Sequence, residues 1–354
     1  MYDFIIIGAA QAGLSMAYEL NQLDKNYLVL DKEDEIGASW LKRWDSLRLF
    51  TPSEFNNLKG MDFPKPKGHY PNKYEVADYF KSYVEQFEIP VRLNTLVTEI
   101  QDKGDYFVVG HEDGFLETKQ VIIATGPFHI PYIPPFYKKI KTSIFQIHSD
   151  YYKNPDQLQA GKAMVVGAGD SGYQILDEIS DTNREVYFSG DTDVSTLPQE
   201  FLGKTLWWWF TKTGYLSFSK NSWLGKKISQ SKQPVIGVDV KGILNKDNVI
   251  PVGKTIDAKQ HHIIVEQGKL HDIKNIIWAT GYRPKFDWIE GLELDKNGYP
   301  VHHRGVSNID GLYFIGLPWL HTRASATLGG IQKDAGYLGD YIRAKDKNEN
   351  LISV

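Results

Sequence analysis

The sequence predicts an α/β fold with two similar units, and the main evidence is a pair of glycine-rich loops. The first loop is "GAAQAG" at residues 8–13, and the second is "GAGDSG" at residues 167–172. Each loop follows a short apolar run and precedes a segment with apolar residues at helical spacing. A strand, a glycine loop and a helix in this order are typical of a Rossmann-like dinucleotide-binding unit.

The first unit begins with the β-branched run that ends at Ile7, which predicts a buried parallel strand. The helix "LSMAYELNQLD" and the strand "NYLVLDKE" follow the loop. Asp31 ends this second strand, 23 residues after Gly8, where an acid accepts hydrogen bonds from a ribose. Free N–H groups at the start of the helix would bind the phosphates.

Ala10 stands where the motif has its second glycine, the residue that lets the backbone approach a pyrophosphate. The methyl group fits if Ala10 keeps a negative φ, because helix N–H groups hold most of the phosphate. We therefore expect a dinucleotide to bind here, more loosely than usual.

The second unit has Ser189 at the position that matches Asp31, followed by Gly190 and Asp191. An acid in this region favours a free ribose 2′-hydroxyl, whereas an arginine favours a 2′-phosphate. Residues 189–195 contain neither arginine nor lysine, so we expect NADH to be used at least as well as NADPH. The alternative is that a distant arginine or lysine folds over the phosphate.

Two further strands end in Ala-Thr-Gly, at residues 124–126 and 279–281, and each is expected to close one unit. The C-terminal segment predicts one more strand, a loop and a helix. We expect a discontinuous first domain, residues 1–155 and 282–354, with a second domain, residues 156–281, inserted into it. The active site should lie between them.

Composition excludes several classes of function. The net charge of −4 gives no sign of a nucleic-acid groove. The chain has no cysteine, so redox chemistry requires a bound cofactor. We expect no metal site, because the histidine pairs lack ligand spacing. Without a signal peptide or a long apolar run, we expect a cytoplasmic protein that has no membrane as a partner. The aromatic run "TLWWWFTKTGYL" favours burial between domains or a substrate entrance over the alternative, anchoring at a membrane interface, where tryptophan beside lysine is also common.

Several longer stretches carry a resemblance to a known family: "IGASW" (36–40), "WDSLRLFTPS" (44–53), "YPNKYEVADYF" (70–80) and "GLYFIGLPWLHTRASATLGG" (311–330). Together with both loops, they resemble the small bacterial flavin-containing monooxygenases, relatives of the Baeyer–Villiger monooxygenases. The resemblance covers nearly the whole chain. It implies that the first loop binds FAD and the second binds NADH or NADPH.

The loops and the resemblance together assign two sets of residues. The expected FAD site comprises Gly8, Ala10, Gln11, Ala12, Gly13, Asp31, Lys32, Trp40, Arg48, Thr51, Val97, Ala124, Thr125, Gly126 and Gly316. The expected NAD(P)H site comprises Gly167, Gly169, Asp170, Ser171, Gly172, Ser189, Gly190, Ala279, Thr280 and Gly281.

The chain departs from the family pattern at two places. The identifying sequence F-x-G-x-x-x-H-x-x-x-[Y/W] keeps His148 and Tyr152 but has Thr142 and Ile144 at the Phe and Gly positions. We expect His148 to act in the linker between domains, as a structural and gating residue. Phe50 stands where the family carries an asparagine near the flavin, and Phe cannot hydrogen-bond.

The resemblance implies an FAD-dependent monooxygenase that oxygenates a sulfide, an amine or a ketone through a C4a-hydroperoxyflavin. Its partners would be a small organic substrate and O2, and the chain could form a homodimer. Phe50 favours the main alternative, an NAD(P)H oxidase or reductase without oxygen insertion. A non-catalytic FAD-binding protein is a third reading, which the intact second glycine loop opposes.

Overall fold

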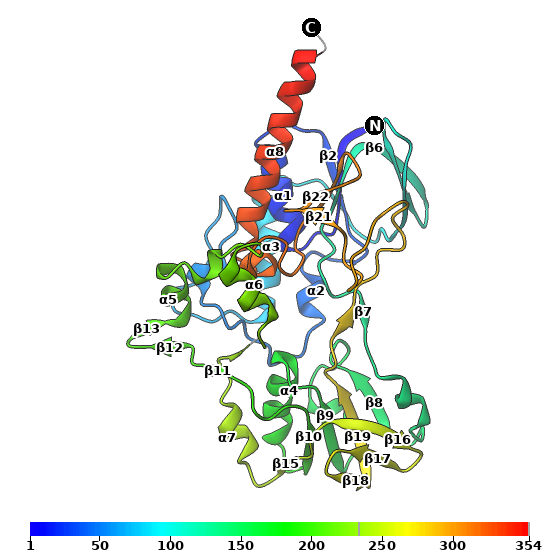
Figure 1. The fold of residues 1–354 in the computed structure, drawn as a ribbon, viewed down its shortest axis with the longest axis vertical. Helices are drawn as coiled ribbons and strands as arrows, with labels where there is room; N and C mark the ends of the chain where they lie inside the picture. The colour runs from blue at the N-terminus through cyan, green and yellow to red at the C-terminus, as the bar shows by residue number, and fades with distance from the viewer. Residues whose placement is uncertain (233, 353–354) are drawn as a thin grey trace.

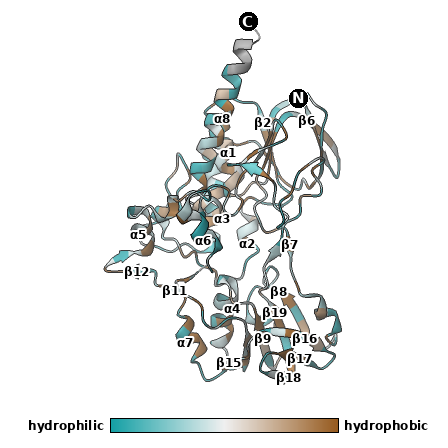
Figure 2. Cartoon of the chain, in the orientation of Figure 1, coloured by the Kyte–Doolittle hydropathy of each residue, from teal (hydrophilic) through white to brown (hydrophobic). Residues whose placement is uncertain are grey.

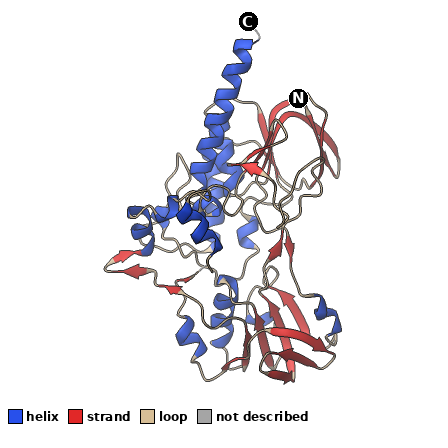
Figure 3. Cartoon of the chain, in the orientation of Figure 1, coloured by secondary structure: helices blue, strands red, loops and turns tan. Residues whose placement is uncertain are grey.

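The computed structural model describes residues 1–232 and 234–352, which form two lobes joined by a narrow connection (Figure 1). Both lobes have a central parallel sheet with helices against it, so the predicted α/β fold with two Rossmann-like units is confirmed. The first lobe carries both ends of the chain, and the long C-terminal helix extends beyond it (Figure 3).

The first lobe is built on five parallel strands in the order β23-β6-β1-β2-β3. The central strand β1 is buried from Phe4 to Ile7, as expected of a strand covered on both faces. The parallel strands are β1 (Tyr2–Ile7), β2 (Tyr27–Leu30), β3 (Val91–Arg92), β6 (Gly114–Ile123) and β23 (Leu312–Phe314). Two antiparallel extensions are attached to it. Strands β4 (Val97–Asp102) and β5 (Phe107–His111) continue from β6, and β21 (His302–His303) and β22 (Val306–Ser307) continue from β23. The helices are α1 (Gln11–Asn21), α2 (Ala38–Leu41), α3 (Lys73–Gln86) and α8 (Ile331–Ile352).

The second lobe has a five-stranded parallel sheet in the order β15-β10-β9-β19-β8. Its apolar strands contrast with the more polar loops around them (Figure 2). The strands are β8 (Phe145–His148), β9 (Lys162–Val166), β10 (Val186–Ser189), β15 (Val249–Pro251) and β19 (Ile273–Trp278). Helices α4 (Asp170–Ser180) and α7 (Val240–Leu244) pack on this sheet, and β16 (Thr255–Lys259), β17 (His262–Val265) and β18 (Gly268–His271) form an antiparallel meander.

The chain passes between the lobes on two strands, β7 (Ile130–Pro131) and β20 (Tyr282–Arg283), which pair antiparallel. Strand β8 follows β7 and pairs with β19, so residues 145–148 belong to the second sheet. This pairing differs from the expected boundary at residue 155. We therefore propose that the first domain passes into the second at β7, and that the chain returns at β20.

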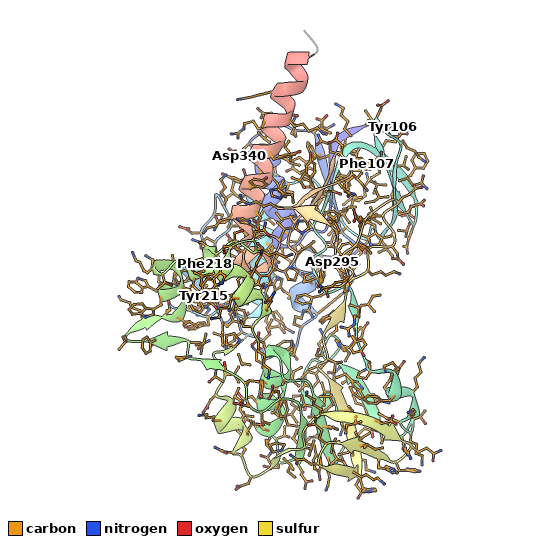
Figure 4. All side chains as sticks on the ribbon, viewed as in Figure 1. Tyr106, Phe107, Tyr215, Phe218, Asp295 and Asp340 are labelled. Carbon is orange, nitrogen blue, oxygen red and sulfur yellow. The ribbon has the colours of Figure 1, made fainter. Side chains whose placement is uncertain are left out.

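One segment of the second lobe reaches across to the first. We call residues 196–232 the tryptophan segment; it contains β11 (Thr196–Leu197), β12 (Glu200–Phe201), β13 (Lys204–Thr205), α5 (Leu206–Lys212) and α6 (Trp223–Gln230). Strand β11, at the start of the tryptophan segment, pairs with β14 (Val235–Ile236), which follows the segment in the chain. Tyr215 and Phe218 of this segment lie beside the first lobe in Figure 4, and the Tyr215 hydroxyl accepts a hydrogen bond from Arg323 at 2.9 Å.

Candidate dinucleotide sites

The two glycine loops have matching geometry, and in each the first glycine has a positive φ. The φ of Gly8 is +109° and that of Gly167 is +124°, values that L side chains rarely adopt. A Cβ atom on Gly8 would lie 2.7 Å from the carbonyl oxygen of Ala124, and one on Gly167 would lie 2.1 Å from that of Ala279. The Ala-Thr-Gly backbone therefore fills the space beside each loop, which explains why both loops start with glycine.

The third glycine of each loop allows the helix to pack closely on the strand. A Cβ atom on Gly13 would lie 1.8 Å from the carbonyl oxygen of Gly8. A Cβ atom on Gly172 would lie 2.0 Å from the carbonyl oxygen of Gly167. These contacts involve rigid backbone, so no larger residue fits at either position without moving the helix.

The second glycine position of the motif differs from the first and third positions, because a side chain fits there. Ala10 has φ −90° and ψ −170°, and Gly169 has φ −91° and ψ −179°. The condition set for Ala10, a negative φ, is therefore met. A Cβ atom built on Gly169 meets no described protein atom within 4 Å. Ala10 itself is partly buried, and its methyl group packs against the apolar core of the first lobe.

The starts of α1 and α4 lack the side-chain caps that other helices of this protein have. Neither Ala10 nor Gly169 caps its helix with a side chain. By contrast, α3, α5, α6 and α7 are each capped by a side chain, from Asn72, Thr205, Ser222 and Asp239 respectively. Where a helix begins just after a parallel strand and its first N–H groups have no side-chain cap, those groups can bind an anion. Both loops therefore fit the pyrophosphate of a dinucleotide.

Asp31 is held beside the first loop by two backbone N–H groups. The N–H of Ala9 donates to Oδ2 of Asp31 at 2.5 Å, and the N–H of Glu33 donates to Oδ1 at 2.9 Å. The carboxylate therefore lies at the carboxyl end of β2, directly against the glycine loop. This is where a ribose of a dinucleotide would meet an acid. Lys32 is exposed next to it.

Of the other expected FAD residues, Trp40 and Gly316 contact the start of α1, whereas Thr51 contacts its own segment. The indole N–H of Trp40 points to the side-chain oxygen of Gln11 at 3.4 Å. Gly316 has φ +80°, and a Cβ atom there would lie 2.8 Å from Cβ of Ala12, so the C-terminal loop packs directly on α1. Thr51 is buried and donates to Asn56 at 2.6 Å.

Three of the expected FAD residues have less specific surroundings. Arg48 is exposed, and its guanidinium lies 3.4 Å from the carbonyl oxygen of Tyr70. Val97 starts β4 and is half-buried. Thr125, which directly precedes Gly126, has its hydroxyl 3.1 Å from Nε2 of His129.

Phe50 contacts the tryptophan segment. Its ring stacks on the ring of Trp207, with centroids 5.8 Å apart and an interplanar angle of 15°. The two rings join a small apolar cluster with Leu206 and Ile236 of the second lobe. Phe50 therefore forms part of an apolar wall to which both lobes contribute.

The second site is lined by both acids and lysines. A cavity of about 340 Å³ at the end of β10 is bordered by Gly190, Asp191 and Lys254. The carboxylate of Asp191 pairs with Lys232, which holds its pKa below the ordinary value. Ser189 is buried, and its hydroxyl is 2.7 Å from that of Thr255. Two distant lysines thus reach this region, as the alternative reading of the sequence allowed.

Asp170 is the first residue of α4 and faces the opposite lobe. Surrounding protein raises the pKa of its carboxyl, while the backbone of Ile236 and the charge of Arg323 oppose that rise. Ser171 and Gly172 follow Asp170 on the same helical turn. Elsewhere in the expected NAD(P)H site, the hydroxyl of Thr280 donates to the carbonyl oxygen of Tyr132.

His148 ends β8 at the connection between the lobes. It is buried, Nε2 donates to the carbonyl oxygen of Gly281 at 3.0 Å, and Nδ1 accepts from the N–H of Asp150 at 3.1 Å. Both ring nitrogens are therefore engaged in the neutral form, and burial lowers the pKa of His148. Beside it, the hydroxyl of Tyr282 donates to Asp150 at 2.6 Å and accepts from Arg43 at 2.7 Å.

Comparison with known proteins places the chain in a family. Residues 5–200 match the family model described as pyridine nucleotide-disulphide oxidoreductase, and the chain belongs to this family. An uncharacterised oxidoreductase of Bacillus subtilis, CzcO, is 43% identical over 96% of this chain and 98% of its own length. The predicted enzyme class, an oxidoreductase, is confirmed.

Solved structures share the fold over nearly the whole chain. A variant of a flavin monooxygenase from Stenotrophomonas maltophilia is 25% identical, with a TM-score of 0.81 over 97% of this chain and 98% of that one. Cyclohexanone monooxygenase from Rhodococcus, bound to NADP+, has a TM-score of 0.73 over 98% of this chain and 85% of its own, at 16% identity. The prediction of FAD and NAD(P)H as cofactors is confirmed at the level of these relatives.

Sequence reasoning missed several residues that the fold brings to the sites. Arg43, Asp150 and Tyr282 form one network from three separate segments, and no local pattern identifies them. The tryptophan run was noticeable, but its contact with Phe50 was not predictable. No helix in the described part of the chain is long and apolar enough to cross a membrane.

Proposed function

We propose that the protein is an FAD-dependent monooxygenase that takes electrons from NADH or NADPH. The observation that carries the proposal is the pair of matched glycine loops, each with an uncapped helix start. The first loop would hold FAD, with Asp31 at its ribose and helix α1 at its phosphates. The second would hold the nicotinamide dinucleotide, with its adenosine end at the cavity beside Gly190 and Asp191.

The absence of cysteine separates this chain from the disulphide chemistry in the name of its family. The chain contains no cysteine, so it has no thiol pair of its own to pass electrons through. The acceptor must therefore be a molecule that reaches the flavin from outside. The resemblance to flavin monooxygenases supports O2 and a small organic substrate as that acceptor and its partner.

FAD, when bound, supplies the chemistry by which O2 is activated and one oxygen atom reaches a sulfide, an amine or a ketone. The protein contributes binding, orientation and exclusion of water. Phe50 and Trp207 offer an apolar wall without hydrogen-bonding groups on the ring faces. Both ring nitrogens of His148 are engaged by backbone groups, so its part is to position the connection between the lobes rather than to move a proton.

The second candidate is an NAD(P)H oxidase or reductase that inserts no oxygen. Phe50 favours it, because a phenyl ring cannot hold a coenzyme amide or a reactive oxygen species by hydrogen bonds. The same ring can limit water access instead, so the stacking on Trp207 supports the monooxygenase.

Labelled oxygen distinguishes the two candidates. The purified enzyme with FAD, NADH and ¹⁸O2 is incubated with a panel of sulfides, amines and ketones, and products are analysed by mass spectrometry. Incorporation of one labelled atom establishes the monooxygenase. Peroxide in amounts equal to the NADH consumed, with no labelled product across the panel, counts against the monooxygenase and favours the oxidase.

A further inference from the structure

The tryptophan segment ends in a hairpin whose turn carries an exposed leucine. Strands β12 and β13 pair Phe201 with Lys204, so Leu202 and Gly203 form the two-residue turn. Their φ values are +50° and +69°, which define a turn that normally selects Asn-Gly. Leu202 is 75% exposed and strained there. Neither packing nor turn preference explains a leucine at this position, and strained exposed residues often serve function.

Aromatic rings and lysines surround the turn. Phe201 is 55% exposed and lies against Trp209, whose indole N–H donates to the Phe201 carbonyl oxygen at 2.9 Å. The ammonium groups of Lys204 and Lys212 lie 5.9 Å and 5.8 Å from the ring centre of Trp208. We call this set the hairpin face: Phe201, Leu202, Lys204, Trp208, Trp209 and Lys212.

The charge of the tryptophan segment is opposite to that of the whole chain. Residues 196–232 contain six lysines and one glutamate, a net charge of +5, whereas the chain carries −4. Within the part of the chain that the structure describes, only Lys232 of these six lysines belongs to an ion pair. The other five remain available to an anionic surface.

Against the expectation from the sequence that a membrane is no partner, we propose that the hairpin face docks the protein on a membrane surface that contains anionic lipid. Exposed Phe201 and Leu202, with half-buried tryptophan rings and lysines beside them, match the acyl boundary and the charged headgroups of such a surface. The hairpin projects away from both lobes (Figure 1), and a narrow tip suits insertion into lipid better than the broad contact of a stable protein interface.

Docking in this way would bring lipid close to the proposed active site. Trp207 lies on the same helix as Trp208 and Trp209, and it contacts Phe50 of the first lobe. An apolar substrate or acceptor dissolved in lipid could then enter along α5. This last step rests on the proposed function, whereas membrane binding itself does not.

Vesicle sedimentation tests the proposal with the FAD-loaded full chain. Vesicles of phosphatidylcholine alone are compared with vesicles that contain 30% phosphatidylglycerol, at low and high salt. We expect binding to the anionic vesicles that falls steeply with salt. Lys204→Gln should weaken it on the order of fivefold. Leu202→Asn should weaken it several-fold while its turn geometry improves, because Asn suits a positive φ.

The β5–β6 hairpin provides the matched control. Phe115 is 65% exposed beside its turn, but its neighbours Glu112, Asp113 and Glu117 are acidic. Phe115→Ala should therefore leave vesicle binding unchanged. Absence of binding to anionic vesicles at low salt overturns the proposal. So does self-association in solution that Leu202→Asn abolishes, because the hairpin face would then bind a second copy. Flavin reduction by NADH, measured without vesicles, reports on the proposed function separately.

Discussion

The indole N–H of Trp207 donates a hydrogen bond of 2.9 Å to the carbonyl oxygen of Phe50, although the two residues are 157 positions apart. The bond and the stacked rings fix the tryptophan segment of the second lobe against the first. The chain thus closes one side of the proposed active site with a contact between its two lobes.

Trp207→Ala should release this contact. Replacing a buried tryptophan with alanine costs about 3 kcal/mol or more, and here the loss mainly weakens the docking of the tryptophan segment on the first lobe. We expect faster proteolysis within residues 196–232 and a larger share of NADH electrons recovered as peroxide, because water reaches the flavin. Trp223→Ala is the control, since Trp223 is 74% exposed on the same segment. Unchanged peroxide yield in Trp207→Ala would refute the role of this wall.

Ala10→Gly should raise FAD occupancy or leave it unchanged. The backbone of Ala10 already has the conformation of Gly169, so glycine needs no change of backbone here, and loss of the partly buried methyl group lets the loop come closer to the pyrophosphate. Occupancy is measured as the ratio of absorbance at the flavin and protein bands. Gly8→Ala should lose flavin instead, because of its positive φ and the 2.7 Å approach of Ala124. A clear loss of FAD in Ala10→Gly would contradict the assignment of this loop.

Lys254→Ala should weaken binding of a 2′-phosphorylated coenzyme selectively. Lys254 borders the cavity beside Asp191, where the 2′ position of the adenosine ribose would lie. We expect the Kd of 2′,5′-ADP to rise about tenfold, with little change for 5′-AMP, as one charge-assisted contact is lost. Asp191→Ala should shift preference the opposite way. Calorimetric titration measures both, and Lys226→Ala serves as the control. An equal rise in Kd for both ligands would show that Lys254 does not contact the 2′-phosphate.

His302 should make the protein less stable in mild acid. Burial, with Lys220 and His303 nearby, lowers the pKa of His302 to about 4 from an ordinary value of 6.5. Between pH 6.5 and about 4 the unfolded chain therefore binds more protons than the folded one, so stability falls as pH falls. His302→Gln should flatten this part of the profile, by roughly 2–3 kcal/mol across the range. Urea unfolding at pH 7.5 and 4.5 measures it, with exposed His261→Gln as the control.

Tyr282→Phe should loosen the connection between the lobes without emptying the first site. The variant loses hydrogen bonds to Asp150 and Arg43, a cost of about 1–3 kcal/mol when a charged partner is left partly buried. We expect slower flavin reduction by NADH in stopped-flow experiments and an unchanged Kd for FAD. Tyr151→Phe, at an exposed position beside it, should change neither quantity. Loss of FAD affinity in Tyr282→Phe would indicate a role in the first site instead.

The sequence by itself determined the two dinucleotide-binding units and their order. Strand, glycine loop, helix and acid lie within about thirty residues, and the conformations they require are local: a positive φ at Gly8 and close packing at Gly13. For Ala10 the sequence could only set a condition, a negative φ, and the structure supplied the angle that meets it.

Only the tertiary structure decided which distant segments complete the sites. The contact of Trp207 with Phe50, the approach of Lys232 to Asp191 and the placement of β8 in the second sheet all depend on how the chain returns between lobes. Apolar periodicity reports which face of an element is buried, but it does not say against what. Contacts between segments so far apart depend on the packing of whole lobes, so no local pattern in the chain encodes them.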